Sequence, residues 1–466
     1  MSRISRALFA IWALAAIAAP LRALADDGKN VDVDPLDPTI YRQGETYLRP
    51  TIVLEGAGFS ESKAWLGESR EVIGDHVGYW WEYAITGGLE GALSLGESGL
   101  LYGRASAIGT GSDGLDAAGS DFDNHYPEKL EAEDLYVGWR SGSLFKGLDK
   151  NALDISVGKQ KYQIGNGFFM WDGGSDGGSR GAYWIGARKA FYSSAIVRFK
   201  TGPYKVEGFY LKPNDEPYSS TDVAGGNFEY TAGDTGKLGV TYLKIFDSDR
   251  TSRDDMDFFD WRASLTPLPS DRSFSISGEY ALEVNGSSSN SSAWYGEVGY
   301  AFDETFWKPA LSYRYSWFEG DDPGSADAEI WDPIFYGFSD WSTWYVGEII
   351  GEFVTANQNL GMQTVRLAAH PSDAVTVQLL YNYYTLLDTT TEIAARDLGL
   401  SPRAVDVHSK YIGQSLDLAA DWSPNPHLAF SGVIAAFRPG AAAQQFVDAR
   451  TSSWWMHFML YTKVNF

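Results

Sequence analysis

Charged side chains recur on stretches of the sequence in which every second residue is apolar; Arg314, for example, lies between Tyr313 and Tyr315. The residues that share this placement are Arg198, Lys200, Arg262, Arg314, Arg366, Lys463, Glu279 and Glu297. Cations gathered in a space of low dielectric constant attract carboxylates, and neighbouring acids let a bound anion leave again. These residues therefore predict the passage of an anion rather than a reaction. For any one of them, a structural salt bridge is the alternative.

Two lysines do not follow this alternation. Lys159 and Lys161 share the parity of Ile155 and Val157, so strict alternation would turn both cations toward the apolar side. On a lipid-facing wall such a cation costs about 2–4 kcal/mol at the bilayer midplane. A bulge at Gly158 would re-aim the residues that come after it. We therefore expect both lysines on the polar side, with the other cations.

Motifs for catalysis or cofactor binding are out of context. Residues 109–114 match a dinucleotide-binding pattern by letter, and residues 173–181 match a nucleophile elbow twice, but no strand-to-helix transition accompanies either segment. The sequence has no cysteine, and its six histidines are scattered singly. Of these, His457 is the candidate for chemistry, on the polar side of its stretch. We expect no catalytic residue, no resident metal and no cofactor.

The elements that must position these residues read as β-strands. Residues 273–282, 294–302, 311–317 and 375–383 alternate apolar with polar side chains. Each runs for about ten residues, the length that a tilted strand needs to cross a bilayer. Short turns, as at 270–271, 303–304, 371–373 and 424–426, alternate with long polar connections at about 109–128, 172–187, 212–233, 247–258, 319–358 and 387–410. This cadence predicts an all-β fold, a transmembrane antiparallel β-barrel with periplasmic turns and extracellular loops, in one domain over residues 26–466.

The end of the sequence carries the most specific signal. Alternate residues from Trp454 to Phe466 share one largely apolar face, and Phe466 is the last residue. Outer-membrane barrels commonly end in such an aromatic-capped strand, which the barrel-assembly machinery reads, so we expect Phe466 to be the assembly signal. The alternative is a soluble edge strand, but an exposed strand this apolar would aggregate in water.

The other end reads as an export signal. Residues 1–25 combine Arg3 and Arg6, an apolar stretch to Pro20 and a small-residue cleavage site before Asp26, so we expect this segment to be removed. The 466-residue chain has 61 acidic and 37 basic residues and a net charge of -24, which argues against a nucleic-acid partner. The acidic segments 109–123 and 319–332 could hold divalent cations near lipopolysaccharide, or could simply be solvated.

Several segments, in this order and spacing, resemble the bacterial alginate-export outer-membrane porins. They are residues 131–139, 157–161, 357–361, 411–417, 437–440 and the final strand to Phe466. The resemblance implies an 18-stranded monomeric barrel with an arginine- and lysine-rich constriction guarded by a periplasmic turn and extracellular loops, whereas counting strands in the sequence gives only sixteen to twenty. It also implies a departure at the pore: where the family places an inward arginine, this sequence has Glu133. A carboxylate there would reverse the local field.

We therefore expect a protein of the cell outer membrane that lets a uronate-type exopolysaccharide, or another anionic solute, cross passively. A general or substrate-specific diffusion porin for small acids or sugars is the first alternative, and an outer-membrane enzyme is a more distant one. The expected partners are outer-membrane lipid and lipopolysaccharide, the barrel-assembly machinery, the anionic cargo and periplasmic biosynthesis or export proteins.

Overall fold

The structure is a computed structural model that describes residues 38–64, 76–116, 127–214, 221–250, 252–285, 290–322, 324, 329–335, 349–389, 407–447 and 454–466. The expected signal segment, residues 1–25, lies outside the described residues. None of the helices in the described part of the chain is long and apolar enough to cross a membrane.

The described chain forms one closed ring of 18 antiparallel strands. They are β2 (Thr46–Ala64), β3 (His76–Ser94), β4 (Leu100–Leu115), β5 (Glu128–Arg140), β6 (Leu153–Gln160), β7 (Phe191–Thr201), β8 (Tyr204–Lys212), β9 (Thr221–Thr231), β10 (Gly236–Ser248), β11 (Asp257–Leu265), β12 (Phe274–Val284), β13 (Asn290–Ala301), β14 (Ala310–Phe318), β15 (Leu360–Ser372), β16 (Val375–Leu386), β17 (Tyr411–Asn425), β18 (Leu428–Pro439) and β19 (Trp455–Asn465). The short strand β1 (Tyr41–Gln43) pairs with β2 outside this ring.

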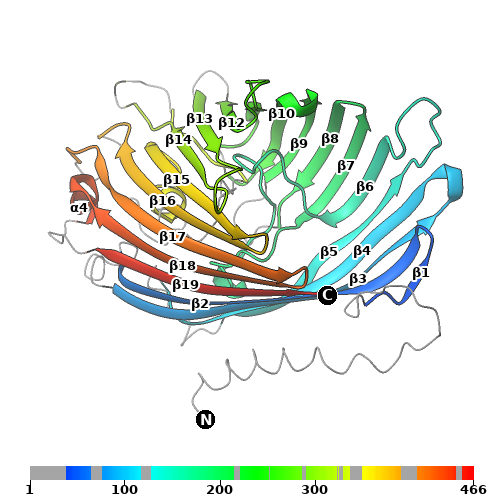
Figure 1. The fold of residues 1–466 in the computed structure, drawn as a ribbon, viewed down its shortest axis with the longest axis horizontal. Coiled ribbons are helices and arrows are strands. Elements are labelled where there is room, and N and C mark those ends of the chain that lie inside the picture. Colours follow the sequence, from blue (N-terminus) through cyan, green and yellow to red (C-terminus); the bar gives the residue numbers. More distant parts are fainter. Residues whose placement is uncertain are drawn as a thin grey trace, which may run out of the picture.

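The ring closes between the first and last of these strands. Phe458 of β19 pairs with Ser60 of β2, and Figure 1 shows the red and blue ribbons side by side at this seam. Closure removes the free sheet edges that a barrel cannot leave in lipid. The expected all-β transmembrane barrel is confirmed, and so is the strand number that the resemblance implied.

Alternation along each strand separates two faces. On β3, Tyr79, Trp81 and Tyr83 are exposed on the outside, whereas Trp80 and Glu82 between them are buried. Successive side chains of a strand point to opposite faces, so the outer wall is mainly apolar and aromatic, and the inner wall carries most of the charged residues. We call the space inside this inner wall the lumen.

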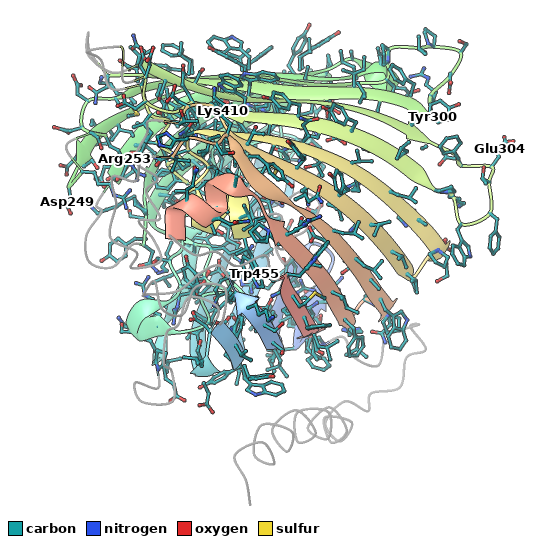
Figure 2. All side chains as sticks on the ribbon, turned by 90° about the vertical axis from the view of Figure 1, so that its left-hand side faces the viewer. Asp249, Arg253, Tyr300, Glu304, Lys410 and Trp455 are labelled. Atoms are coloured by element: carbon teal, nitrogen blue, oxygen red, sulfur yellow. The ribbon has the colours of Figure 1, made fainter. Side chains whose placement is uncertain are left out.

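The two ends of the barrel differ in their connections. Short turns and the last residue, Phe466, lie at one end, and long connections lie at the other; Figure 2 shows Tyr300 and Glu304 at the first end, opposite Asp249 and Arg253. Short periplasmic turns and longer extracellular loops are typical of such barrels. The remaining helical turns are η2 (Gly96–Ser98), η3 (Gly178–Arg180), η4 (Gly233–Thr235), η5 (Ile349–Val354) and α4 (Ala441–Val447).

Two of the expected long connections are wrong in extent. Residues 212–233 contain β9, and β4 continues to Leu115 instead of ending near residue 109. The sequence of β9 holds two glycines, an asparagine and an aspartate, which weaken any strand pattern. Its pairing with β8 and β10 supplies the hydrogen bonds on both sides that its composition does not predict.

The last residue closes the seam at the periplasmic end. The amide of Phe466 donates to the carbonyl of Ile52 (2.9 Å), the amide of Ile52 donates back (3.2 Å), and the ring of Phe466 stacks on His427 with 5.9 Å between ring centroids. The final aromatic thus joins the end of β19 to β2 and to the turn that leads into β18.

Changing Phe466 to Ser should reduce the yield of folded barrel in the outer membrane more than changing Asn465 to Ser. The Phe466 ring supplies the apolar end of the last strand, whereas Asn465 has the opposite parity. The measurement is the fraction of protein with heat-modifiable migration on a gel. Equal yields from the two variants would contradict an assembly role for Phe466.

Candidate functional site: a cationic constriction beside a lumenal loop

The connection between β6 and β7, residues 161–190, folds into the barrel, and we call it the lumenal loop; Figure 1 shows it in teal to green inside the ring. Carboxylates of the wall hold one side of it. Glu82 accepts a hydrogen bond from the amide of Ile185 (2.8 Å), and Glu133 accepts from the amides of Lys189 (2.8 Å) and Ala190 (3.1 Å). Backbone donors of an irregular segment thus find acceptors on the sheet.

Aromatic packing holds the other side of the lumenal loop. Phe169 stacks on Phe258 of β11 (4.8 Å between ring centroids), and Phe168 packs against Tyr295 of β13 (5.3 Å). The loop therefore crosses the lumen from β3–β5 to β11–β13. The sequence predicted residues 172–187 as an extracellular loop, and this is wrong, because Phe168, Phe169 and Met170 are buried before it and Glu82 holds the Ile185 amide at the inner wall.

A glycine permits the close fit of this loop. At Gly174 a Cβ atom would lie 1.8 Å from the carbonyl oxygen of Arg188, which no side chain could tolerate.

A second inward segment meets the lumenal loop. Residues 329–335, from the connection between β14 and β15, approach it: the amide of Trp171 donates to the carbonyl of Phe335 (2.6 Å), and Trp331 packs on Phe258. Arg253 holds this segment through a bidentate contact with Asp332, both distances being 2.7 Å. The lumen is thus narrowed by two segments that brace each other.

A cavity of about 250 Å³ lies between the lumenal loop and the wall of β7 and β8. Its lining contains four cations and one acid: Lys161, Lys189, Arg198, Lys205 and Glu207, together with Tyr162, Gln163 and Trp171. Two of the cations come from the loop and two from the wall. We call this place the cationic constriction.

The wall cations of the constriction are partly neutralised. Arg198 and Lys205 share Glu207, at 3.1 and 2.8 Å, and Glu229 lies 3.7 Å from Lys205. The loop cations differ, because neither Lys161 nor Lys189 forms an ion pair with any residue that the structure describes. Lys189 lies over the ring of Trp171, 4.8 Å from its centroid. The loop lysines are therefore the cations available to a passing anion.

Burial also shifts the pKa values of two charged residues in the lumenal loop. It lowers the pKa of Lys189, an effect that Asp172 opposes by its charge. Burial raises the pKa of Asp172 to about 7, against the opposing charge of Lys189 and a hydrogen bond from the Gly174 backbone. Asp172 therefore changes its charge close to neutral pH, beside the cations of the constriction.

Most of the charged wall residues that the sequence placed inside do face the lumen. Arg314 contacts Glu297 at 2.6 Å and lies over the Tyr295 ring, and Arg262 contacts Asp260 and Glu229. Glu279 is buried on the inner face of β12 and interacts electrostatically with Arg262. These cations are neutralised within the wall, which is the salt-bridge alternative. Their part in a substrate pathway stays a prediction.

Three further cations line the inner face elsewhere. Lys463 contacts Glu55 at 3.0 Å and lies close enough to influence the pKa of Lys189. Arg366 is half-buried on β15, and Lys200 is exposed near the short turn that ends β7. None of these three lines the cationic constriction.

Lys159 does not lie where the sequence predicted it. It pairs in register with Leu135, and its Nζ lies 5.9 Å from the centroid of Tyr192; both of these side chains are exposed on the outer wall. The bulge does not turn Lys159 inward because its extra residue falls on β7, where Phe191 and Ser194 are both buried. Strict alternation therefore continues through Lys159.

Glu133 is also misplaced by the prediction. It is 2% exposed, and its carboxylate accepts the amides of Lys189 and Ala190 instead of lining the pore. It therefore positions a cation of the constriction, Lys189, through the backbone amide of that residue.

Lys189 and Trp171 were not predicted, because they flank residues 172–187, which the sequence predicted as an extracellular loop. One signal was present: residues 168–171 are four consecutive apolar residues within an otherwise glycine-rich and polar connection. A solvated loop has no reason to carry such a run.

The comparison with known proteins decides the family. The family model for alginate export matches residues 121–456. The chain belongs to the alginate export family. Its wall charges and lumenal loop are thus those of an outer-membrane β-barrel porin, and the family and fold indicate a transport protein rather than an enzyme. No curated protein sequence matches this member of the family significantly.

Solved structures of proteins from the bacterium Pseudomonas aeruginosa share the fold of this family member. The outer membrane protein OprD is 14% identical, with a TM-score of 0.53 over 90% of this chain and 93% of OprD. OpdQ is 12% identical and OpdK, solved with vanillate, is 10% identical; each has a TM-score of 0.52 over 90% of this chain and 98% of its own. At such identities the likeness shows the fold alone, and the barrel places the protein in the outer membrane.

Changing Glu133 to Gln should leave the anion selectivity of the pore nearly intact, whereas Glu133→Ala should lower it. Gln keeps the oxygen that accepts the Lys189 amide, and Ala leaves a buried donor unsatisfied at a cost of about 1–3 kcal/mol. The measurement is the reversal potential in a salt gradient across a planar bilayer. If Glu133 acted through its charge, both variants would raise anion selectivity.

Anion selectivity should fall as the pH rises from about 6 to 8. The pKa of Asp172 is raised to about 7, so this carboxyl is neutral below that pH and adds a negative charge beside Lys189 above it. In Asp172→Asn the reversal potential should stay at its low-pH value throughout. A pH response that persists in Asp172→Asn would assign it to another group.

Proposed function

We propose that this porin passes carboxylate-bearing solutes, of which uronate-type oligosaccharides and polysaccharides are the main class. The observation that carries the proposal is the pair of loop cations, Lys161 and Lys189, that stand in the constriction without an ion-pair partner among the described residues. A carboxylate that enters can therefore contact a cation without first displacing a protein acid. The description of the family as alginate export supports the same class of cargo.

The charges close to the constriction affect a passing anion more than the net charge of the whole chain does. At a distance of about 8 Å and an effective dielectric constant of 20, one cation stabilises a monovalent anion by about 2 kcal/mol. Exposed acids farther away than a Debye length, about 8 Å at physiological salt, contribute little. A net charge of -24 is thus compatible with an anion-selective pore.

A second candidate is a diffusion porin for small organic acids. The cavity of about 250 Å³ favours it, because small-molecule sites are commonly of about 300–1,000 Å³ and a space of this size holds one acid at a time. A polymer would have to pass this place one sugar unit after another. Both candidates use the same two cations.

Replacing both Lys161 and Lys189 with Gln should lower the permeability ratio of anions to cations at least tenfold, since each tenfold requires about 1.4 kcal/mol. The measurement is again the reversal potential, combined with block of the current by oligouronates of increasing length. Lys308→Gln, an exposed lysine in a short turn, makes the same type of charge change outside the lumen and serves as the control.

The outcomes separate the candidates. Block that strengthens with the length of the oligouronate supports the polymer cargo, and equal block by a single uronate supports the small-acid porin. A wild-type channel that prefers cations, or a double variant that matches the wild type, would contradict both.

A further inference from the structure

Lys159 is a cation on the lipid-facing side of the barrel. Leu135, its partner in register, is 61% exposed, and Tyr192, whose ring lies beside the Lys159 ammonium, is 60% exposed on the same outer wall. Val157, two residues earlier, is exposed there as well. A cation at such a place needs a reason, because its exposed neighbours Leu135 and Val157 are apolar.

The height of Lys159 on the wall places it in the outer leaflet. Strand β6 ends at Gln160 and leads into the lumenal loop, at the end of the barrel that carries the long connections. Strands β7 and β8 have Phe191 and Lys212 at the same end. This is the level at which aromatic side chains of a barrel meet lipid headgroups.

Lys159 differs from the other lysines at this end of the outer wall on β6–β10. Lys212 contacts Asp222 at 3.0 Å, and Lys244 contacts Asp255 at 2.8 Å and Asp257 at 3.5 Å. Lys159 has no ion pair with any residue in the described part of the chain; its neighbour is the Tyr192 ring, 5.9 Å away. Lys212 and Lys244 thus each have an acidic partner, and Lys159 has none among the described residues.

We propose that Lys159 and Tyr192 form a binding site for a phosphate group of lipopolysaccharide in the outer leaflet. The ammonium supplies three donors and a full charge, and lysine is a common phosphate ligand. The Tyr192 ring holds the ammonium by a cation–π contact, and its hydroxyl can donate to a phosphate oxygen. The exposed apolar neighbours Leu135 and Val157 lie where the acyl chains of the same lipid would pack.

The location argues for a lipid rather than a dissolved anion. The site faces away from the lumen, so a solute on its way through the pore does not meet it. A lysine near a membrane surface strengthens attraction to anionic lipid about fivefold. The expected occupant is therefore the molecule that surrounds this wall and carries phosphate at this depth.

The test is lipid retention by the purified barrel in detergent, measured by native mass spectrometry. The probes are lipid A with its phosphates, dephosphorylated lipid A, and inorganic phosphate as a competitor. Retention of phosphorylated lipid A should fall about fivefold in Lys159→Gln. In Lys212→Gln it should change little, because Asp222 already neutralises that lysine in the wild type.

Each outcome bears on the proposal. Loss of retention in Lys159→Gln alone, with weak binding of the dephosphorylated lipid, supports it, and a smaller loss in Tyr192→Leu supports the part of the ring. Equal retention of both lipids, equal retention by wild type and Lys159→Gln, or displacement by inorganic phosphate at low concentration would overturn it.

The reversal potential keeps this test apart from the pore. Lys159→Gln should fold, show heat-modifiable migration and conduct with the selectivity of the wild type, since its side chain lies outside the lumen. A change in selectivity would return Lys159 to the pore and would contradict the outer-wall site.

Discussion

The constriction depends on one contact between the wall and the loop. The carboxylate of Glu133 accepts hydrogen bonds from the backbone amides of Lys189 and Ala190. It fixes Lys189 at the point where the chain re-enters the wall as β7, and so sets how far a cation reaches into the lumen. Glu82 repeats the arrangement at Ile185. Buried carboxylates are costly unless they accept hydrogen bonds, and these two obtain theirs from backbone donors that would otherwise be unsatisfied. The wall and the loop each supply what the other lacks.

The cations of the lumen fall into two groups with different roles. Arg314 pairs with Glu297 on the neighbouring strand, and Arg262 pairs with Glu229 two strands away, so neither cation offers a free charge to the lumen. Lys161 and Lys189 come from a connection and have no such partner among the described residues. Stability of the barrel and selectivity of the pore are thus carried by different residues, although all of them would count as inward cations in the sequence.

Local periodicity was enough to predict most of the wall. The strands around residues 273–317 and the final strand up to Phe466 could be predicted from their alternation of apolar and polar residues. Closure of the barrel keeps one face of each strand toward lipid and the other toward the lumen, so this alternation persists. Periodicity failed for β9, where pairing on both sides overrides a composition rich in glycine and asparagine. For Lys159, strict alternation was right and the expected bulge at Gly158 was wrong, because the extra residue of the irregularity lies on the partner strand. A bulge is a property of two strands, and one strand's sequence does not reveal which of them carries it.

The constriction could not be predicted for a similar reason: its geometry depends on residues far apart in the sequence. The direction in which a long connection folds depends on acceptors that lie far away in the sequence, such as Glu82 and Glu133, so Lys189 could not be placed from its own neighbourhood. Barrels with 10–14% identity share this ring of strands with the present chain. Because a ring of alternating strands is satisfied by many sequences, the barrel itself constrains the cargo little. What a family member transports is decided by the few side chains that its inward connections hold in the lumen, and in this chain these are two lysines positioned by buried carboxylates of the wall.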